Sequence, residues 1–122
     1  MALIEKRRDA WVHENLETYL GLTAEDYVLE VNGHEEMRGR AAFEDMIRRN
    51  YEGFRPVSWD FHEIVSHGSK VLAEWTVAME EKATGIRWSV MGMSICEVRD
   101  GVVTWWREYR LPASSGVRNT DT

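Results

Sequence analysis

The stretch from Pro56 to Leu111 is dominated by the two-residue alternation that is typical of β-strands. Apolar and polar residues alternate through four segments, 57–65, 71–79, 86–98 and 102–111, with short turns between them. Consecutive strands that are joined by short turns pair antiparallel. This part of the chain therefore predicts an antiparallel meander.

The residues before Pro56 predict helices and one earlier strand. Helical spacing of apolar side chains, with Asn15 as an N-cap, predicts helices over 3–14, 16–20 and 41–51. Strand-forming residues predict a strand over 27–32, with a turn at 23–26 and a polar loop at 34–39. Early helices and late strands predict an α+β fold, in which a curved antiparallel sheet wraps around the helices and encloses an apolar pocket.

Composition and charge disfavour several classes of partner and location. The 122 residues can bury one core, which we assign to residues 1–111, and residues 112–122 are expected to form a polar tail. A formal net charge of -6 disfavours nucleic acid and anionic membranes. The single cysteine, Cys96, permits no internal disulfide, and no segment resembles a membrane helix or a signal peptide. We therefore expect a cytoplasmic protein.

Strand alternation also predicts which side chains line the pocket. The predicted cavity faces carry Val28, Glu30 and Asn32; Trp75, Val77 and Met79; Trp88, Val90, Gly92 and Ser94; and Trp106, Glu108 and Arg110. On these faces tryptophan rings would wall the cavity, and Gly92 would leave room for a ligand. Glu108 and Glu30 would be poorly solvated carboxylates suited to general acid–base chemistry, and Asn32 could hold a water or a carbonyl oxygen.

Each of these residues also has a purely structural explanation. Glu108 could pair with Arg110 at a strand end, and Glu30 could face solvent. Asn32 and Gly33 could form only a turn, and the tryptophans could be ordinary core. The four histidines show no metal spacing, and no phosphate-binding loop appears, so we expect neither a metal nor a cofactor.

Two segments resemble a known family. They read VLEVNGHEEMRGRAAFEDMI, and SHGSKVLAEWTV followed by WSVMGMSICEVRDGVVTWWREY. Over residues 4–111 their order and spacing are similar to those of the SnoaL-like and limonene-epoxide-hydrolase-like branch of the nuclear transport factor two-like superfamily. The resemblance implies a cone-shaped, cystatin-like barrel, a fold that hosts isomerases, hydrolases, cyclases, dehydratases and non-catalytic binders.

The resemblance also implies roles at individual positions. Matched to the limonene-epoxide hydrolases, Glu108 falls where one catalytic Asp would lie. Asn32 falls near the water-holding Asn, and Glu30 where a Tyr would lie. Trp75 and Val77 occupy the positions of the catalytic Arg and the second Asp, so the epoxide-opening set is incomplete. A match to ketosteroid isomerases would place the base at Glu30 or Asn32.

These patterns predict a cofactor-independent isomerase, hydrolase or cyclase that acts on a small, lipophilic, polyketide- or terpenoid-like molecule. The expected catalytic residues are Glu108, Glu30 and Asn32. The expected ligand contacts are Trp75, Val77, Met79, Trp88, Val90 and Trp106. A non-catalytic binding protein and a dimeric interaction module of the same fold are the alternatives. The opposite strand faces carry an apolar set that predicts a homodimer, namely Met91, Met93, Ile95 and Trp105.

Overall fold

Three helices and six strands follow one another along residues 2–111, the part of the chain that the computed structural model describes. In chain order they are α1 (Ala2–Val12), α2 (Leu16–Gly21), β1 (Thr23–Val31), β2 (His34–Arg38), α3 (Arg40–Gly53), β3 (Phe54–His67), β4 (Lys70–Glu81), β5 (Arg87–Arg99) and β6 (Val102–Arg110). The predicted tail at 112–122 lies outside the described residues.

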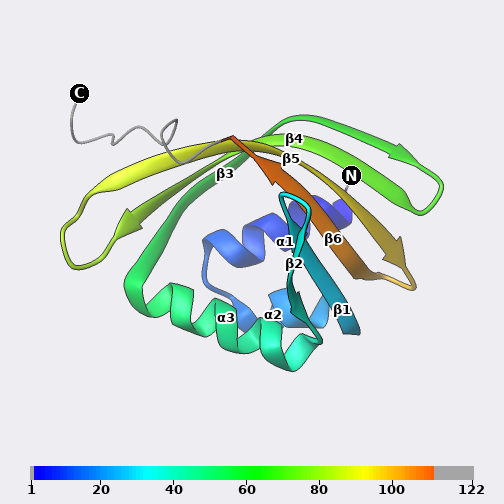
Figure 1. The fold of residues 1–122 in the computed structure, drawn as a ribbon, viewed down its shortest axis with the longest axis horizontal. Coiled ribbons are helices and arrows are strands. Elements are labelled where there is room, and N and C mark those ends of the chain that lie inside the picture. Colours follow the sequence, from blue (N-terminus) through cyan, green and yellow to red (C-terminus); the bar gives the residue numbers. More distant parts are fainter. Residues whose placement is uncertain (1, 112–122) are drawn as a thin grey trace.

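The described strands form one mixed sheet in the order β2-β1-β6-β5-β4-β3. Strands β3 to β6 pair antiparallel with their chain neighbours, as the alternation predicts. Strand β1 instead pairs parallel with β6, although the two strands are far apart in the sequence. The sheet curves around the helices, which lie on its concave side (Figure 1). The predicted α+β class and curved, cone-like sheet are confirmed, although the sheet is open rather than a closed barrel.

The helices form where the helical spacing predicts them. Asn15 is the N-cap of α2, and its side-chain oxygen accepts a hydrogen bond from the backbone N–H of Thr18 at 3.3 Å. Helix α3 turns Phe43 and Ile47 toward the sheet and buries both. No helix within residues 2–111 has the length and apolarity of a membrane span.

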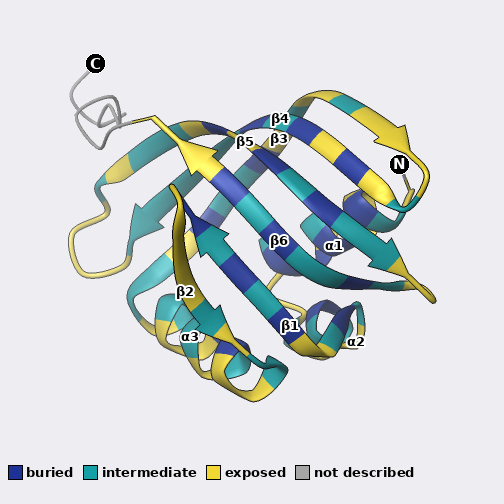
Figure 2. Ribbon diagram, turned by 45° about the vertical axis from the view of Figure 1, so that its right-hand side comes forward, coloured by how far each residue is buried: buried dark blue, intermediate teal, exposed yellow. Residues whose placement is uncertain are grey.

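The prediction of a polar loop at 34–39 is wrong. Residues His34–Arg38 form the edge strand β2, which pairs antiparallel with β1. Most of its side chains are exposed, and only Met37 is partly buried (Figure 2). An edge strand that rests on its backbone hydrogen bonds needs no alternation of apolar residues, so the pattern carried no signal. The predicted turn at 23–26 is likewise the first part of β1.

Burial follows the pleat of the central strands. On β5 the buried residues Gly92, Ser94 and Cys96 alternate with the outward-facing Met91 and Met93 (Figure 2). The concave face of the sheet and the helices thus share one core, and the same face supplies most of the walls of the cavity described next.

Candidate functional site

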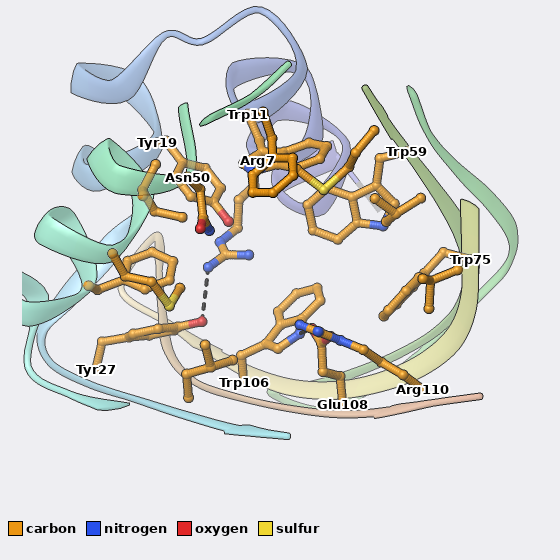
Figure 3. Close-up of a pocket in the computed structure, with 18 of the residues that line it drawn as sticks. Arg7, Trp11, Tyr19, Tyr27, Asn50, Trp59, Trp75, Trp106, Glu108 and Arg110 are labelled. Carbon is orange, nitrogen blue, oxygen red and sulfur yellow. Dashed lines mark hydrogen bonds and ion pairs between the residues drawn. The ribbon is translucent and has the colours of Figure 1, made fainter. Parts of the chain in front are cut away.

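A cavity of about 340 Å³ lies between the concave face of the sheet and the helices (Figure 3). Its lining is aromatic (Trp11, Tyr19, Tyr27, Phe43, Phe54, Trp59, Trp75, Trp88, Trp106), aliphatic (Leu29, Met46, Ile47, Val77, Met79, Val90) and polar (Arg7, Asn50, Glu108, Arg110). Every tryptophan of the chain except Trp105 belongs to this lining. A concave site of this size with few polar groups suits a small lipophilic ligand.

Tryptophan rings give the cavity a fixed shape. Trp59 meets three of them edge to face, with ring centroids 5.6 Å from Trp11, 6.1 Å from Trp75 and 5.7 Å from Trp106. The indole N–H of Trp75 donates to the hydroxyl of Ser94 at 3.0 Å, which holds the orientation of that ring. Interlocked rings of this kind leave little freedom for the wall to collapse into the space.

Arg7 extends from α1 into the cavity (Figure 3). It lies on the same helical face as the buried Ile4 and Trp11, and only 2% of its surface is exposed. Its guanidinium carbon stands 4.6 Å from the ring centroid of Tyr19 and 4.7 Å from that of Trp106. One terminal nitrogen donates to the hydroxyl of Tyr27 at 3.1 Å. The cavity therefore contains a buried cation held between aromatic faces.

The phenols around Arg7 are protonated at neutral pH. Burial raises the pKa of Tyr19 and of Tyr27 above the usual value, although the charge of Arg7 opposes the rise. Burial also acts to lower the pKa of Arg7, but its interactions with the two tyrosines outweigh burial and raise it. Arg7 is thus a cation at neutral pH, and both phenols keep a proton that they can donate.

Glu108 supplies a buried carboxylate on the opposite wall. It lies on the same face of β6 as Trp106, and 8% of its surface is exposed. Its Oε1 accepts a hydrogen bond from the indole N–H of Trp106 at 2.8 Å, and its Oε2 pairs with the Nε of Arg110. Among the residues described, no other carboxylate lines the cavity. A carboxylate has about four lone-pair sites, so two donors orient Glu108 and leave it able to accept a proton.

The structure brings together most of the predicted site residues. All of the predicted ligand contacts line the cavity, namely Trp75, Val77, Met79, Trp88, Val90 and Trp106. Glu108 shares that cavity with them. The sequence therefore predicted correctly which faces of β4, β5 and β6 point into the cavity.

The predicted concave face of β1 is wrong, and Glu30 lies outside the cavity. Thr23, Tyr27, Leu29 and Val31 are the buried residues of that strand, whereas Glu30 is only partly buried. Its carboxylate pairs with the Nε of Arg107 on the neighbouring strand at 3.4 Å. The face with Tyr27, Leu29 and Val31 is the more apolar one in the sequence, and it packs against the helices because burial favours it.

Asn32 is exposed and also lies outside the cavity lining. It has a positive φ of 49°, directly after β1 ends. Its side-chain oxygen accepts a hydrogen bond from the backbone N–H of Arg110 at 2.8 Å, and its own N–H donates to the carbonyl of Glu108 at 2.9 Å. Asn32 thus fastens the end of β1 to β6 and supports the backbone that carries Glu108.

Gly92 does not leave room for a ligand as predicted. A Cβ placed there would lie 2.7 Å from the ring of Trp75 and 2.8 Å from the carbonyl oxygen of Tyr109. The glycine is needed because the indole of Trp75 lies across the backbone of β5 at this point. The space that the missing side chain leaves is filled by the protein.

Eight polar or aromatic members of the site were missed from sequence: Arg7, Trp11, Tyr19, Tyr27, Phe43, Asn50, Phe54 and Trp59. The available signal for Arg7 was its spacing, since it follows Ile4 by three residues and precedes Trp11 by four on one helix. A charged residue in the middle of an apolar helical face is unusual and marks Arg7 as a candidate, although the spacing does not separate a buried arginine from one that extends into water.

No cluster of potential metal ligands occurs among the described residues. Cys96 lies in the sheet and is buried. Burial raises the pKa of its thiol to about 11, so it stays protonated at neutral pH and is a poor nucleophile. Glu108 and Arg7 are therefore the charged groups from which chemistry in this cavity can be argued.

Residues 4–106 match the family model of the SnoaL-like domain. No curated protein sequence matches the chain significantly. Among solved structures, the chain is similar to an LEH-like epoxide hydrolase of M. tuberculosis. The two share 26% sequence identity with a TM-score of 0.81, over 90% of this chain and 80% of that one.

Two further solved structures share the fold. A protein from Xanthomonas campestris, to which polyketide cyclase activity is attributed, has 26% identity and a TM-score of 0.72 over 88% of this chain and 87% of its own. A protein from Bacillus subtilis, to which isomerase activity is attributed, shares 23% identity with this chain. Its TM-score is 0.78 over 91% of this chain and 85% of that protein. These relatives share an architecture but differ in the reactions attributed to them.

Proposed function

Since the chain belongs to the SnoaL-like domain family, we propose that it is a cofactor-independent isomerase, hydrolase or cyclase that transforms a small lipophilic molecule in the aromatic cavity. The observation that carries the proposal is Glu108, a carboxylate that is 8% exposed and lines the cavity. Its neighbours Trp106 and Arg110 fix its orientation. A positioned carboxylate in an apolar site is suited to move a proton to or from a bound substrate.

The proposal is for acid–base chemistry and not for the complete Asp-Arg-Asp epoxide opening. By resemblance, Trp75 and Val77 stand at two positions of that set, and both are apolar walls of the cavity. Glu108 stands at the third. In the proposed reaction its carboxylate takes a proton from a substrate carbon or from a water, and later returns it.

The proposed activity is tested by incubating the purified chain, without metal or cofactor, with lipophilic epoxides and with β,γ-unsaturated ketones. We expect turnover of at least one of these classes above the rate in buffer, followed by product chromatography. Quenching of tryptophan fluorescence measures binding in the same samples, because the rings line the cavity. Binding of such compounds without any turnover would contradict the enzyme proposal.

A second function, non-catalytic binding of a similar molecule, is favoured by one observation. Both carboxylate oxygens of Glu108 already accept a hydrogen bond from a protein donor, Trp106 or Arg110. In this second function Glu108 neutralises the adjacent arginine and takes no part in a reaction. The assay above separates the two functions, since a binding protein quenches without product.

We also propose that the chain forms a homodimer through the convex face of its sheet. Met91, Met93 and Tyr109 are 42%, 49% and 52% exposed on neighbouring strands, and Leu72 is 39% exposed beside them. Of the residues predicted from sequence, Ile95 and Trp105 are partly buried on the same strands. A contiguous apolar patch of this kind is typical of an interface.

Sedimentation equilibrium at micromolar concentration is expected to give a dimer. Met93→Lys is expected to give a monomer, because a charge at the centre of an apolar interface remains unpaired. Ala41→Lys adds the same charge at an exposed position of α3 and is expected to leave the dimer intact. A wild-type monomer, or equal behaviour of the two variants, would exclude this interface.

A further inference from the structure

Two buried hydrogen-bond donors among the residues that line the cavity have no acceptor within the described part of the chain. Within residues 2–111, the one hydrogen bond of the Arg7 guanidinium goes to Tyr27, and its Nε has no partner although it is fully enclosed. The indole N–H of Trp59, also in the lining, has no acceptor among the described residues. The carboxylate in the lining, that of Glu108, already accepts hydrogen bonds from Trp106 and Arg110.

The charge of Arg7 is also unbalanced. It makes no ion pair with any carboxylate in the described part of the chain. The charged members of the lining are Arg7, Arg110 and Glu108, so two positive charges face one negative charge. Because Arg110 pairs with Glu108, the unbalanced positive charge lies on Arg7.

Burying an unpaired cation costs free energy unless something compensates it. The cation–π contacts of the guanidinium carbon with the rings of Tyr19 and Trp106 compensate part of this cost. Apart from the hydrogen bond to Tyr27, these contacts leave the guanidinium N–H groups without an acceptor among the described residues. Those groups form a fork that fits the two oxygens of a carboxylate.

We propose that the cavity binds an apolar molecule that carries one carboxylate, with Arg7 and the hydroxyl of Tyr27 holding the carboxylate. The single negative charge of the ligand balances the unpaired positive charge of Arg7. The cavity volume of about 340 Å³ limits the apolar part of the ligand to a small group. The Tyr27 phenol keeps its proton and can donate it to the same oxygens. The aromatic walls enclose the rest of the ligand, where Glu108 faces it.

This inference rests on the proposed function, because it assigns a substrate class to the same cavity. It replaces the neutral ligand that an apolar lining predicts. A carboxylate anchored at Arg7 also fixes the depth of the ligand in the cavity, which is what an enzyme needs in order to present one carbon to Glu108.

The experiment compares octanoate with octanamide, which has the same length but no charge, by isothermal titration calorimetry at neutral pH. We expect octanoate to bind at least about tenfold more tightly, as a charge-assisted hydrogen bond predicts. Arg7→Met keeps a long apolar side chain and removes the charge, and it is expected to abolish the preference. Lys6→Met removes the same charge from an exposed position of the same helix and is expected to retain the preference.

Equal affinity of the wild-type chain for the two probes, or no binding of either, would overturn the carboxylate site. A preference that survives Arg7→Met would overturn the role of Arg7. If Arg7→Met does not fold, Arg7→Lys keeps the charge but loses the forked pair of N–H donors. It is expected to lower the affinity for octanoate and to leave the affinity for octanamide unchanged. A chain that prefers octanoate and yet turns over no substrate leaves this inference standing and removes the proposed enzyme.

Discussion

Replacing Glu108 with Gln is expected to lower the turnover number by about 10²–10⁴-fold, the contribution of a positioned acid or base. Glutamine keeps the shape of the side chain, and its oxygen can still accept the hydrogen bond from Trp106. It cannot take up and return a proton at neutral pH. The ion pair with Arg110 is lost, but the side chain of Arg110 is 48% exposed and can turn toward water. The variant should therefore fold and bind ligand, and fail only in the chemical step.

The measurement is steady-state kinetics on the best substrate of the epoxide and ketone panel, with circular dichroism and fluorescence quenching as checks on folding and binding. Glu30→Gln is the matched comparison, because Glu30 pairs with Arg107 outside the cavity and its loss is expected to spare turnover. Undiminished turnover in Glu108→Gln would make Glu108 a structural residue. If only Glu30→Gln lost turnover, Glu30 would be the catalytic carboxylate.

Gly92→Ala is expected to destabilise the fold by about 1–3 kcal/mol, the usual cost of forcing an extra group into a packed core. The new Cβ would lie 2.7 Å from Cη2 of Trp75 and 2.8 Å from the carbonyl oxygen of Tyr109. The Tyr109 oxygen belongs to the backbone of β6, which pairs with β5 at this point. The Trp75 ring is held by Ser94 and by Trp59. Neither neighbour can yield without loss of other contacts.

Urea unfolding followed by circular dichroism measures this change. Gly53→Ala is the control, because a Cβ at Gly53 meets nothing within 4 Å, and the unfolding midpoint is expected to stay close to that of the wild type. The two explanations of Gly92 predict different results. If Gly92 left space for a ligand, the alanine variant would unfold like the wild type and lose only ligand affinity.

The sequence alone was sufficient for the parts of the fold that depend on local pattern. The alternation from Pro56 onward placed β3 to β6 and paired them correctly, because the turns between them are too short for any other connection. The sequence also predicted that Trp75, Trp106 and Glu108 lie on the strand faces that line the cavity. On β4, the face of Trp75 also carries Val71, Ala73, Val77 and Met79, and burial favours so apolar a face.

The parts that sequence left undecided depend on contacts between distant residues. Glu30 and Asn32 lie outside the cavity because the more apolar face of β1, formed by Tyr27, Leu29 and Val31, packs against the helices. The strand β2 has no apolar pattern, since an edge strand is held by backbone hydrogen bonds to its neighbour. Gly92 reads as an open position until the indole of Trp75 is placed across it.

Arg7 illustrates the same limit at the site itself. Its helical spacing placed it on the apolar face of α1, but an arginine there can extend its charged end into water, as arginine side chains at helix surfaces commonly do. Tyr19 and Tyr27 lie 12 and 20 residues further along the chain, on α2 and β1, and together with Trp106 of β6 they enclose its guanidinium. The charge of the cavity was therefore decided by tertiary structure, because only the folded chain brings these elements around one side chain.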